Sequence, residues 1–189
     1  MKPILIGLTG FARSGKSTAA SHLATEHSFE TYAFMTPLKE GIAAMFNLSI
    51  EDIEGPGKEQ PIDWLGRSPR QLMQLLGTEW GRDMISASIW LDLAEQNLGN
   101  LAELYPEAPG FVISDVRFEN EADFVRQRGG LIIHVQRPDA AAVNPHVSEL
   151  GVAVQPCDVV INNDADFADL FAQLDSVLSA LRNQAQHAA

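Results

Sequence analysis

Short apolar runs alternate along this chain with segments in which apolar residues recur at helical spacing. The runs predict buried strands at residues 4–9, 30–34, 111–114, 131–136 and 158–161. Helices are expected at residues 16–27, 36–46, 68–76, 88–98 and 120–128, and the clearest one carries a stripe of Phe167, Leu170, Phe171, Leu174, Val177, Leu178 and Leu181. Strands alternating with helices predict an α/β fold, a three-layer sandwich with a five-stranded, mainly parallel sheet covered on both faces.

The domain organisation follows from the length and from one long interruption of this alternation. At 189 residues the chain has the size of a single domain. Residues 36–98 hold helical patterns and loops, so we expect a helical insertion between the second and third strands. Within it, Gly77 is expected to break or bend the helix that starts at Ser68 and Pro69. Residues 137–155 are irregular and are expected to form a short lid-like segment.

The charge balance excludes several functions. The chain has 25 Asp and Glu against 13 Lys and Arg, a net charge of -12. Binding nucleic acid in general, or an anionic membrane, requires a basic face, so neither partner is expected. The single cysteine, Cys157, excludes an intrachain disulfide, and we expect it to be a small buried residue of a cytoplasmic protein.

A phosphate-binding motif follows the first predicted strand. Residues 10–17, GFARSGKS, fit GxxxxGK[ST] between a strand and a helix. Gly10 and Gly15 allow backbone N–H groups to turn toward a polyphosphate, Lys16 is placed to reach the outer phosphates, and the Ser17 hydroxyl to reach Mg²⁺. We expect this loop to bind ATP, with further nucleotide contacts from Arg13, Ser14 and Thr18.

Two other strand ends carry candidate residues. Asp115 ends the third strand, where a carboxylate can hold Mg²⁺, and Arg117 follows it. Arg137 ends the fourth strand. Arg117 and Arg137, with Arg70 and Arg82 in the insertion, are candidates for binding phosphate; the alternative is that each pairs with a surface carboxylate. Arg126 and Arg128, on a helix rich in charge, are expected to be solvated.

Some residues have a structural explanation that competes with a functional one. Asn120 is either a helix N-cap, with Asp123 three residues on, or a substrate contact. Trp80 and Phe34 could stack on a base, although aromatic residues at helical spacing are more often core. His146, Ser148 and Glu149 form a polar cluster after Arg137 whose role is open, and the spacing of His and Cys does not favour zinc.

The motifs narrow the reaction class. A switch GTPase would need a guanine-reading NKxD motif after a strand, but the nearest stretch, residues 162–164, reads NND. A motor ATPase usually has two acids at the end of the strand that holds Mg²⁺, but here Asp115 is followed by Val116. A kinase whose acceptor is a phosphate needs no strong base, because that phosphate is already anionic. It needs positioning and charge neutralisation, which Mg²⁺, Lys16 and several arginines supply.

Longer motifs resemble a known family. Residues 68–83, SPRQLMQLLGTEWGRD, followed by Trp90, then residues 114–121, SDVRFENE, and 146–149, HVSE, are similar to the deoxynucleoside monophosphate kinases of tailed bacteriophages and related bacteria. The resemblance implies a P-loop, nucleoside monophosphate kinase-like fold that transfers the γ-phosphoryl group of ATP to a deoxynucleoside monophosphate (dNMP), giving dNDP and ADP. It also implies a cytoplasmic location, in the host if the chain is phage-encoded, and suggests a homodimer.

The resemblance also implies residue roles. Lys16 and Ser17 would serve ATP and Mg²⁺, Asp115 the metal, and Arg70, Arg82 and Arg117 the acceptor or the moving phosphoryl group. Two alternatives stay open. Residues 37–40, PLKE, also resemble animal-type phosphomevalonate kinase, and Lys39 is a substrate candidate under either interpretation. The other alternative is a nucleotide-binding regulatory protein with little turnover.

Overall fold

The computed structural model describes residues 3–140 and 151–187 of the chain, with side chains up to residue 183. Its contacts divide the chain into two compact units. The first unit contains the residues up to Tyr32 and those from Leu101 onward, and the second is Ala33–Asn100. Every strand found in the described residues belongs to the first unit, whereas the second unit is helical.

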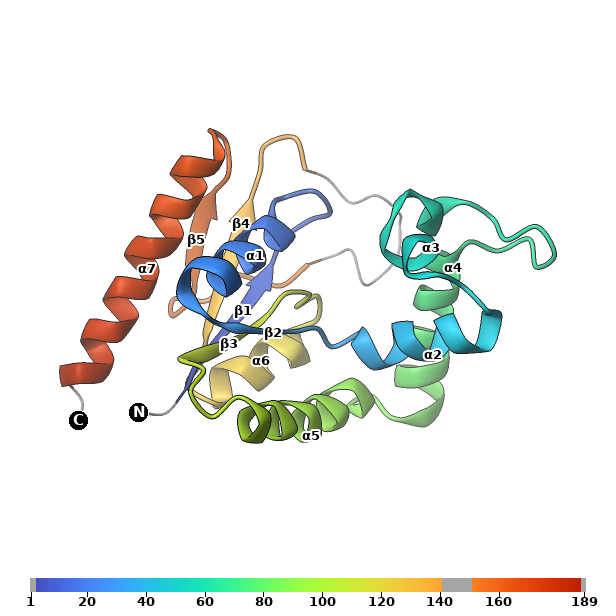
Figure 1. The fold of residues 1–189 in the computed structure, drawn as a ribbon, viewed down its shortest axis with the longest axis horizontal. Coiled ribbons are helices and arrows are strands. Elements are labelled where there is room, and N and C mark those ends of the chain that lie inside the picture. Colours follow the sequence, from blue (N-terminus) through green and yellow to red (C-terminus); the bar gives the residue numbers. More distant parts are fainter. Residues whose placement is uncertain (1–2, 141–150, 188–189) are drawn as a thin grey trace. The chain divides into compact units, whose positions relative to one another are not determined.

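The sheet of the first unit is parallel throughout its described pairings, with the order β2-β3-β1-β4-β5. Its strands are β1 (Ile4–Thr9), β2 (Glu30–Tyr32), β3 (Gly110–Ile113), β4 (Leu131–Gln136) and β5 (Val159–Asn162). The predicted five-stranded parallel sheet is therefore confirmed. Since β1 lies between β3 and β4, the loops after these three strands leave the same edge of the sheet side by side (Figure 1).

Helices cover both faces of this sheet (Figure 1). On one face, Ile6 and Leu8 of β1 form a core with α1 (Lys16–His27) and α7 (Phe167–His187). On the other face lies α6 (Glu119–Gln127), whose Val125 approaches the position that a Cβ on Gly7 would occupy. Alternate residues of β1 thus face opposite layers, as the period of a strand requires.

The stripe predicted for the last helix is correct except at its first position. Leu170, Leu174 and Leu178 of α7 are at most 1% exposed. Phe167 is 63% exposed, because it begins the helix and stacks on Phe171, at 6.2 Å between ring centroids, instead of entering the core.

The second unit consists of short helices. They are α2 (Thr36–Phe46), α3 (Ile50–Glu54), the 3₁₀ helix η1 (Pro56–Glu59), α4 (Pro69–Gln74), the π-helix η2 (Leu75–Ile85) and α5 (Ile89–Leu104), in which the boundary between the units falls. Capping boxes start α3 and α4: the hydroxyls of Ser49 and Ser68 accept from backbone amides three residues on.

Two helices in this region differ from the expected ones. The chain stays helical through Gly77, although α4 gives way to the π-helix η2 at Leu75, so there is no break at this glycine. Trp90 Nε1 donates to the Gly77 carbonyl at 2.7 Å, and a Cβ on Gly77 would lie 2.7 Å from the terminal methyl of Met35. Helix α5 runs past Leu98 to Leu104, with Gly99 exposed inside it. A helical glycine costs only about 1 kcal/mol relative to alanine, which the rest of a sixteen-residue helix offsets.

Candidate active site

The loop after β1 makes a tight turn that leads directly into α1. Gly10 and Gly15 have φ angles of 141° and 109°, in the region that favours glycine, and Arg13 between them has 64°. The amide of Ser14 donates to the carbonyl of Phe11 at 3.2 Å and closes the turn. Helix α1 begins with Gly15 as its N-cap and no side-chain cap, so its first amides and the positive end of its dipole are directed at the loop.

The side chain of Lys16 folds back over this loop. Its Nζ donates to the carbonyls of Gly10 and Phe11, at 2.8 Å each. The ammonium group therefore lies where it can exchange carbonyl oxygens for phosphate oxygens. Next to it, Ser17 is exposed and Thr18 half-buried. Loop, lysine and helix start together have the arrangement of an anion-binding site.

A residue that the sequence did not single out anchors the loop. The side-chain amide of Asn163, just after β5, donates to the carbonyl of Ser14 at 2.8 Å, and both residues are buried. The backbone amide of Asn163 donates in turn to the carbonyl of Gln136 at 2.7 Å. A Cβ on Gly15 would overlap the Asn163 amide nitrogen. The stretch that lacks the guanine-reading motif therefore has a different role, namely holding the phosphate loop against β4 and β5.

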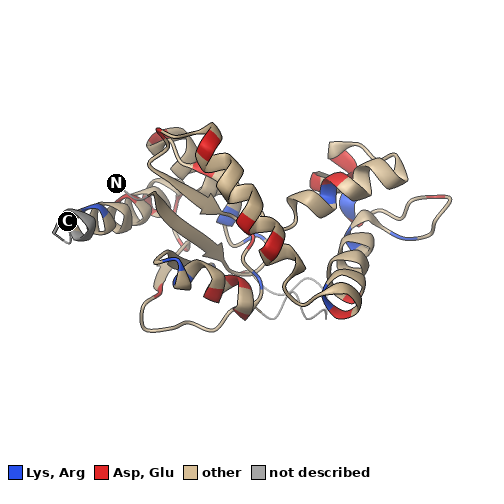
Figure 2. Cartoon of the chain, turned by 90° about the horizontal axis from the view of Figure 1, so that it is seen from below, with Lys and Arg blue, Asp and Glu red and all other residues tan. Residues whose placement is uncertain are grey.

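The exit of β3 is tied to β1. The amide of Val116 donates to the carbonyl of Leu8 at 3.1 Å, and the amide of Ser114 donates to Tyr32 at 3.0 Å. Asp115, half-buried between these two anchored residues, therefore lies beside the end of β1, from which the phosphate loop departs. Figure 2 shows basic residues of the first unit at the arrowhead ends of the strands. The Asp115 carboxylate and the phosphate loop therefore lie at the same edge of the sheet, as the sequence predicts.

Asn120 is not the N-cap of α6. The helix starts at Glu119, one residue earlier than predicted, and the buried carboxylate of Glu121 accepts from the amides of Arg117 (2.7 Å) and Phe118 (3.1 Å). Glu121 thus fixes the backbone that carries Arg117, a role that sequence analysis missed. Asn120 and Arg117 are both half-buried. The structure therefore does not support the N-cap explanation for Asn120.

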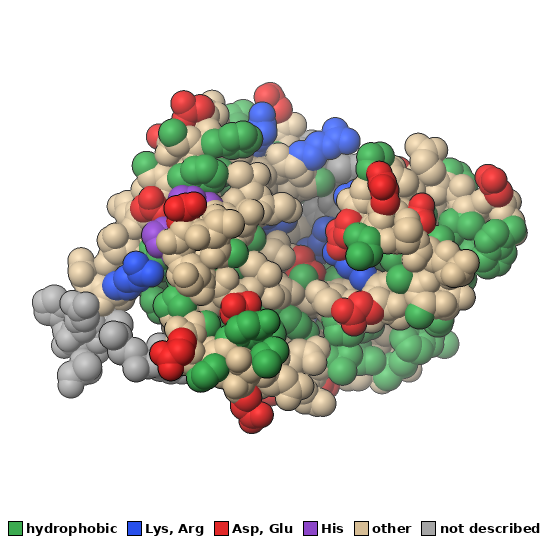
Figure 3. Space-filling view, in the orientation of Figure 1, with side chains coloured by type: hydrophobic (Ala, Val, Ile, Leu, Met, Phe, Trp, Pro, Cys, Tyr) green, Lys and Arg blue, Asp and Glu red, His purple; other side chains and the backbone are tan. Residues whose placement is uncertain are grey.

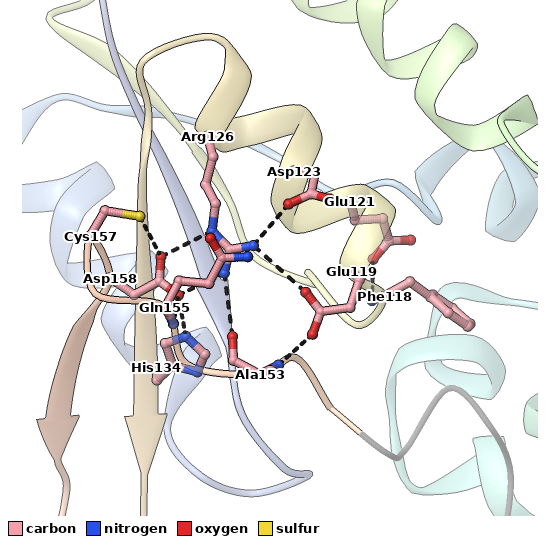
Figure 4. Close-up of polar contacts among 10 residues, drawn as sticks. All are labelled: Phe118, Glu119, Glu121, Asp123, Arg126, His134, Ala153, Gln155, Cys157 and Asp158. Atoms are coloured by element: carbon pink, nitrogen blue, oxygen red, sulfur yellow. Dashed lines mark hydrogen bonds and ion pairs between the residues drawn. The ribbon is translucent and has the colours of Figure 1, made fainter.

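The side chain of Arg126 is largely withdrawn from solvent, although it was expected to be solvated. Its side chain is 10% exposed and binds Asp158 through Nε (3.1 Å) and Nη2 (2.6 Å), while Nη1 contacts Asp123 at 3.1 Å (Figure 4). Asp158 is 1% exposed and also accepts from the Gln155 amide and from His134 Nε2. The network joins α6, β4 and the residue before β5. These segments are far apart along the chain and meet only in the folded protein.

The charges of this network depend on one another. Burial raises the pKa of Asp158, but hydrogen bonds from Arg126, the Gln155 amide and His134 outweigh it, so its pKa lies well below the usual range. The hydrogen bond to Asp158 raises the pKa of Arg126. Cys157, predicted to be buried, is exposed beside the carboxylate, and Arg128, also predicted to be solvated, is half-buried with its guanidinium 3.5 Å from the centroid of the Phe124 ring.

The other predicted substrate residues belong to the second unit. Lys39 Nζ pairs with Glu54 at 2.6 Å, and Arg70 Nε pairs with Glu59. Arg82 is half-buried and its Nη1 lies 3.4 Å from the carbonyl of Ala87. Trp80 is 44% exposed, which disagrees with a core position, whereas Phe34 is fully buried and is core.

The remaining candidate residues lie next to residues 141–150 or within them. Arg137, at the end of β4, is exposed. His146, Ser148 and Glu149 lie outside the described residues, as does most of the lid-like segment predicted for 137–155.

Comparison with known proteins identifies the family. The model of the deoxynucleotide monophosphate kinase family matches residues 64–174, more than half of the chain. The chain belongs to this family. The predicted recognition, P-loop kinase fold and enzyme class are thereby confirmed: deoxynucleotide monophosphate kinases are phosphotransferases, and kinase chemistry implies ATP as the phosphoryl donor.

Relatives and solved structures agree with this assignment. A protein of Acanthamoeba polyphaga mimivirus, provisionally named a deoxynucleotide monophosphate kinase, is 36% identical over 97% of this chain and 98% of its own length. The deoxynucleotide monophosphate kinase of Enterobacteria phage T4 is 31% identical over 60% of this chain, but only 46% of the phage enzyme is matched. A crystallised Thermus thermophilus protein, 21% identical with a TM-score of 0.55, covers 96% of this chain and 99% of its own and shares the fold.

Among the described residues of this family member, no helix combines the length and the apolar character needed to cross a membrane.

Proposed function

We propose that this member of the deoxynucleotide monophosphate kinase family transfers the γ-phosphoryl group of ATP to a dNMP, giving dNDP and ADP. The observation that carries the proposal is the pairing, at one sheet edge, of a phosphate loop containing Lys16 with the Asp115 exit of β3. In kinases the protein mainly positions the reactants and neutralises charge, and these two groups supply both.

The loop fits the phosphates of ATP. A side chain on Gly10 would fill the turn, because a Cβ there would overlap the carbonyl of Val135, and the uncapped start of α1 offers N–H groups to an anion. Lys16 would exchange its two carbonyl partners for phosphate oxygens and stabilise charge on the group in transfer. Arg13, Ser14 and Thr18 would complete the nucleotide contacts, and Arg137 would contact ATP from the end of β4.

Ser17 and Asp115 are the residues that would hold Mg²⁺. A hydroxyl and a carboxylate are oxygen ligands, the kind that Mg²⁺ prefers, and each belongs to one of the two neighbouring loops. When bound, the ion neutralises charge on the phosphates.

The acceptor contacts are proposed residue by residue, separately for each unit. Arg117, whose backbone Glu121 fixes, would bind the acceptor phosphate or the moving phosphoryl group, and Asn120 would contact the nucleotide. From the helical insertion, Lys39, Arg70 and Arg82 would bind the acceptor, and the exposed ring of Trp80 would stack on its base. Lys39 and Arg70 would first release Glu54 and Glu59, their present partners. The enzyme would act in the cytoplasm, of a host if phage-encoded, and a homodimer stays a prediction.

A coupled assay of ADP release tests the proposal. The purified chain is offered ATP, Mg²⁺ and, one at a time, dNMPs, NMPs and phosphomevalonate. We expect turnover with at least one dNMP, and loss of about 10²–10³-fold or more in kcat for Lys16→Ala, because a preorganised charge at the transferring group is removed. The control Arg182→Ala removes an exposed cation of α7 and should keep full activity.

Three results would contradict the proposal. Turnover of phosphomevalonate alone would favour a phosphomevalonate kinase-like enzyme. Nucleotide binding without turnover of any acceptor would favour a regulatory protein. Equal activity of Lys16→Ala and the control would remove the phosphate loop from the chemistry.

A further inference from the structure

A cluster of three potential metal ligands lies away from the phosphate loop, between α1 and α7. His22 and His27 project from α1, and Asp175 from the middle of α7, within the first unit. In the described part of the chain, this is the single group of three or more His, Cys, Asp or Glu side chains able to share an ion. None of the three has a part in the proposed reaction, because His22 and His27 lie about 9 and 17 Å along the helix from Lys16.

The three ligand atoms converge on one point. Asp175 Oδ1 lies 2.7 Å from Nε2 of His22 and 2.7 Å from Nε2 of His27, and all three atoms are within 4.8 Å of one another. The His22 ring stacks on Phe171, with centroids 4.2 Å apart and planes 4° apart, and meets the His27 ring edge-on at 5.4 Å. Ring packing therefore holds the imidazoles in orientations that aim both Nε2 atoms at the carboxylate.

A metal ion can take the place of the two hydrogen bonds in this cluster. A carboxylate oxygen only accepts, so each of the two short contacts requires a proton on Nε2. Both histidines contact the same carboxylate oxygen, Asp175 Oδ1, which is the atom that would ligate. A metal ion would bind the same three atoms through their lone pairs, and each neutral imidazole would then carry its single proton on Nδ1 instead of Nε2.

Solvent reaches the cluster from one side. His22 is 8% exposed, His27 19% and Asp175 48%. Figure 3 shows histidine side chains at the surface beside acidic atoms, on the face of α1 and α7. The site is therefore walled by protein on the His22 side and open at Asp175, so an ion can enter and keep a water ligand.

We propose that His22 Nε2, His27 Nε2 and Asp175 Oδ1 bind a divalent transition metal of the zinc class, with water completing the coordination. Two imidazoles and one carboxylate suit Zn²⁺, whereas Mg²⁺ is held by oxygen ligands, so this site and the kinase's magnesium site select different ions. In a tetrahedral zinc site the ligand atoms stand about 3.3 Å apart, so Asp175 moves outward by a few tenths of an ångström from its present contacts.

Metal binding would join two helices that otherwise meet through apolar packing and these hydrogen bonds. Ala19, Ala20 and Leu23 of α1 and Leu170, Leu174 and Leu178 of α7 already share one core. Since a ligand that binds only the folded state stabilises it by mass action, zinc should raise the melting temperature by about 5–10 °C at a free concentration of 100 times Kd.

The test uses the full chain, freed of metal with a chelator, without nucleotide. Zn²⁺ is titrated by calorimetry and by thermal melting, and Co²⁺ is used as a spectroscopic probe of coordination. We expect one equivalent to bind, tenfold excess Mg²⁺ not to displace it, and His27→Gln and Asp175→Asn each to weaken it at least tenfold. Both variants replace partly exposed residues. The matched control is Asp169→Asn, an exposed carboxylate on the same helix, and it should bind zinc like the wild type.

Several outcomes would overturn the assignment. Absence of zinc binding or of a melting shift in the wild type would leave the cluster as a hydrogen-bonded clamp only. Binding of equal strength in His27→Gln and Asp175→Asn would place the metal elsewhere on the chain. A drop in Asp169→Asn as large as in Asp175→Asn would show an unspecific effect of charge.

Discussion

Replacing Asp158 by asparagine should destabilise the protein far more than the same replacement at Asp123, although both carboxylates bind Arg126. The difference lies in burial. Asp158 is 1% exposed and accepts four hydrogen bonds from nitrogen donors, two of them from the guanidinium, whereas Asp123 is 50% exposed and makes one contact with it. The asparagine side chain would keep one acceptor oxygen and present an N–H group to donors, leaving the buried guanidinium without its main counter-charge.

The magnitude follows from these contacts. Removing one partner of a buried ion pair costs about 3–5 kcal/mol. The low end, about 3 kcal/mol, applies because Arg126 keeps Asp123 and Glu119. In a domain of this size this corresponds to a fall in Tm of about 6–12 °C. Asp123→Asn should cost less than about 1 kcal/mol, as exposed pairs do. The double variant Arg126→Met, Asp158→Leu should recover only part of the loss: it buries no unpaired charge, but the Gln155 amide and His134 lose their acceptor.

Denaturant unfolding of the variants at pH 7, repeated at lower pH, measures both the loss and its origin. The folded pKa of Asp158 lies below the unfolded value of about 3.9. Its contribution is therefore complete above the unfolded pKa and is lost as the pH falls through the folded one. The advantage of the wild type over Asp158→Asn should persist at pH 5 and shrink below about pH 4. Equal losses for Asp158→Asn and Asp123→Asn, or an advantage that grows in acid, would refute the reasoning.

Two further predictions concern the phosphate loop. Asn163→Ala removes the buried hydrogen bond to the Ser14 carbonyl and should raise KM for ATP about tenfold, with a smaller change in kcat. The control Asn162→Ala, at the exposed neighbouring position, should leave KM unchanged. Steady-state kinetics in which the two variants have the same KM would argue against the role of Asn163 as an anchor. Gly15→Ala should abolish the thermal shift produced by ATP, because its Cβ overlaps the Asn163 amide at a φ of 109°, and a normal shift would show that the loop adapts.

The parts of the fold that the sequence predicts are those encoded locally. Apolar runs predict the five strands, and the central strands β1, β3 and β4 are largely buried, as the inner strands of a parallel sheet are. The phosphate loop is predictable because a strand, two glycines, Lys16 and a helix start are contiguous. Asp115 is predictable because parallel strands end at one edge.

The largest errors involve partners that are distant in the sequence. Arg126 looks solvated on its helix, and only the fold brings Asp158 to it. Asn163 follows a strand without any recognisable motif, and its role exists only because β5 lies next to β4. Cys157, taken for a buried residue on composition alone, sits in an exposed turn beside Asp158. Gly77 lies inside a helical stretch, and its carbonyl accepts from Trp90, 13 residues further along the chain.

The bond from Asn163 to Ser14 also bears on how the active site forms during synthesis. Its two residues are 149 positions apart, so the phosphate loop leaves the ribosome long before its anchor is made. Contacts of such separation form late, since loop closure must precede them. A nascent chain that stops short of β5 would have the glycines and Lys16 but not the rigid loop. The nucleotide site should therefore become competent as one of the last events of folding.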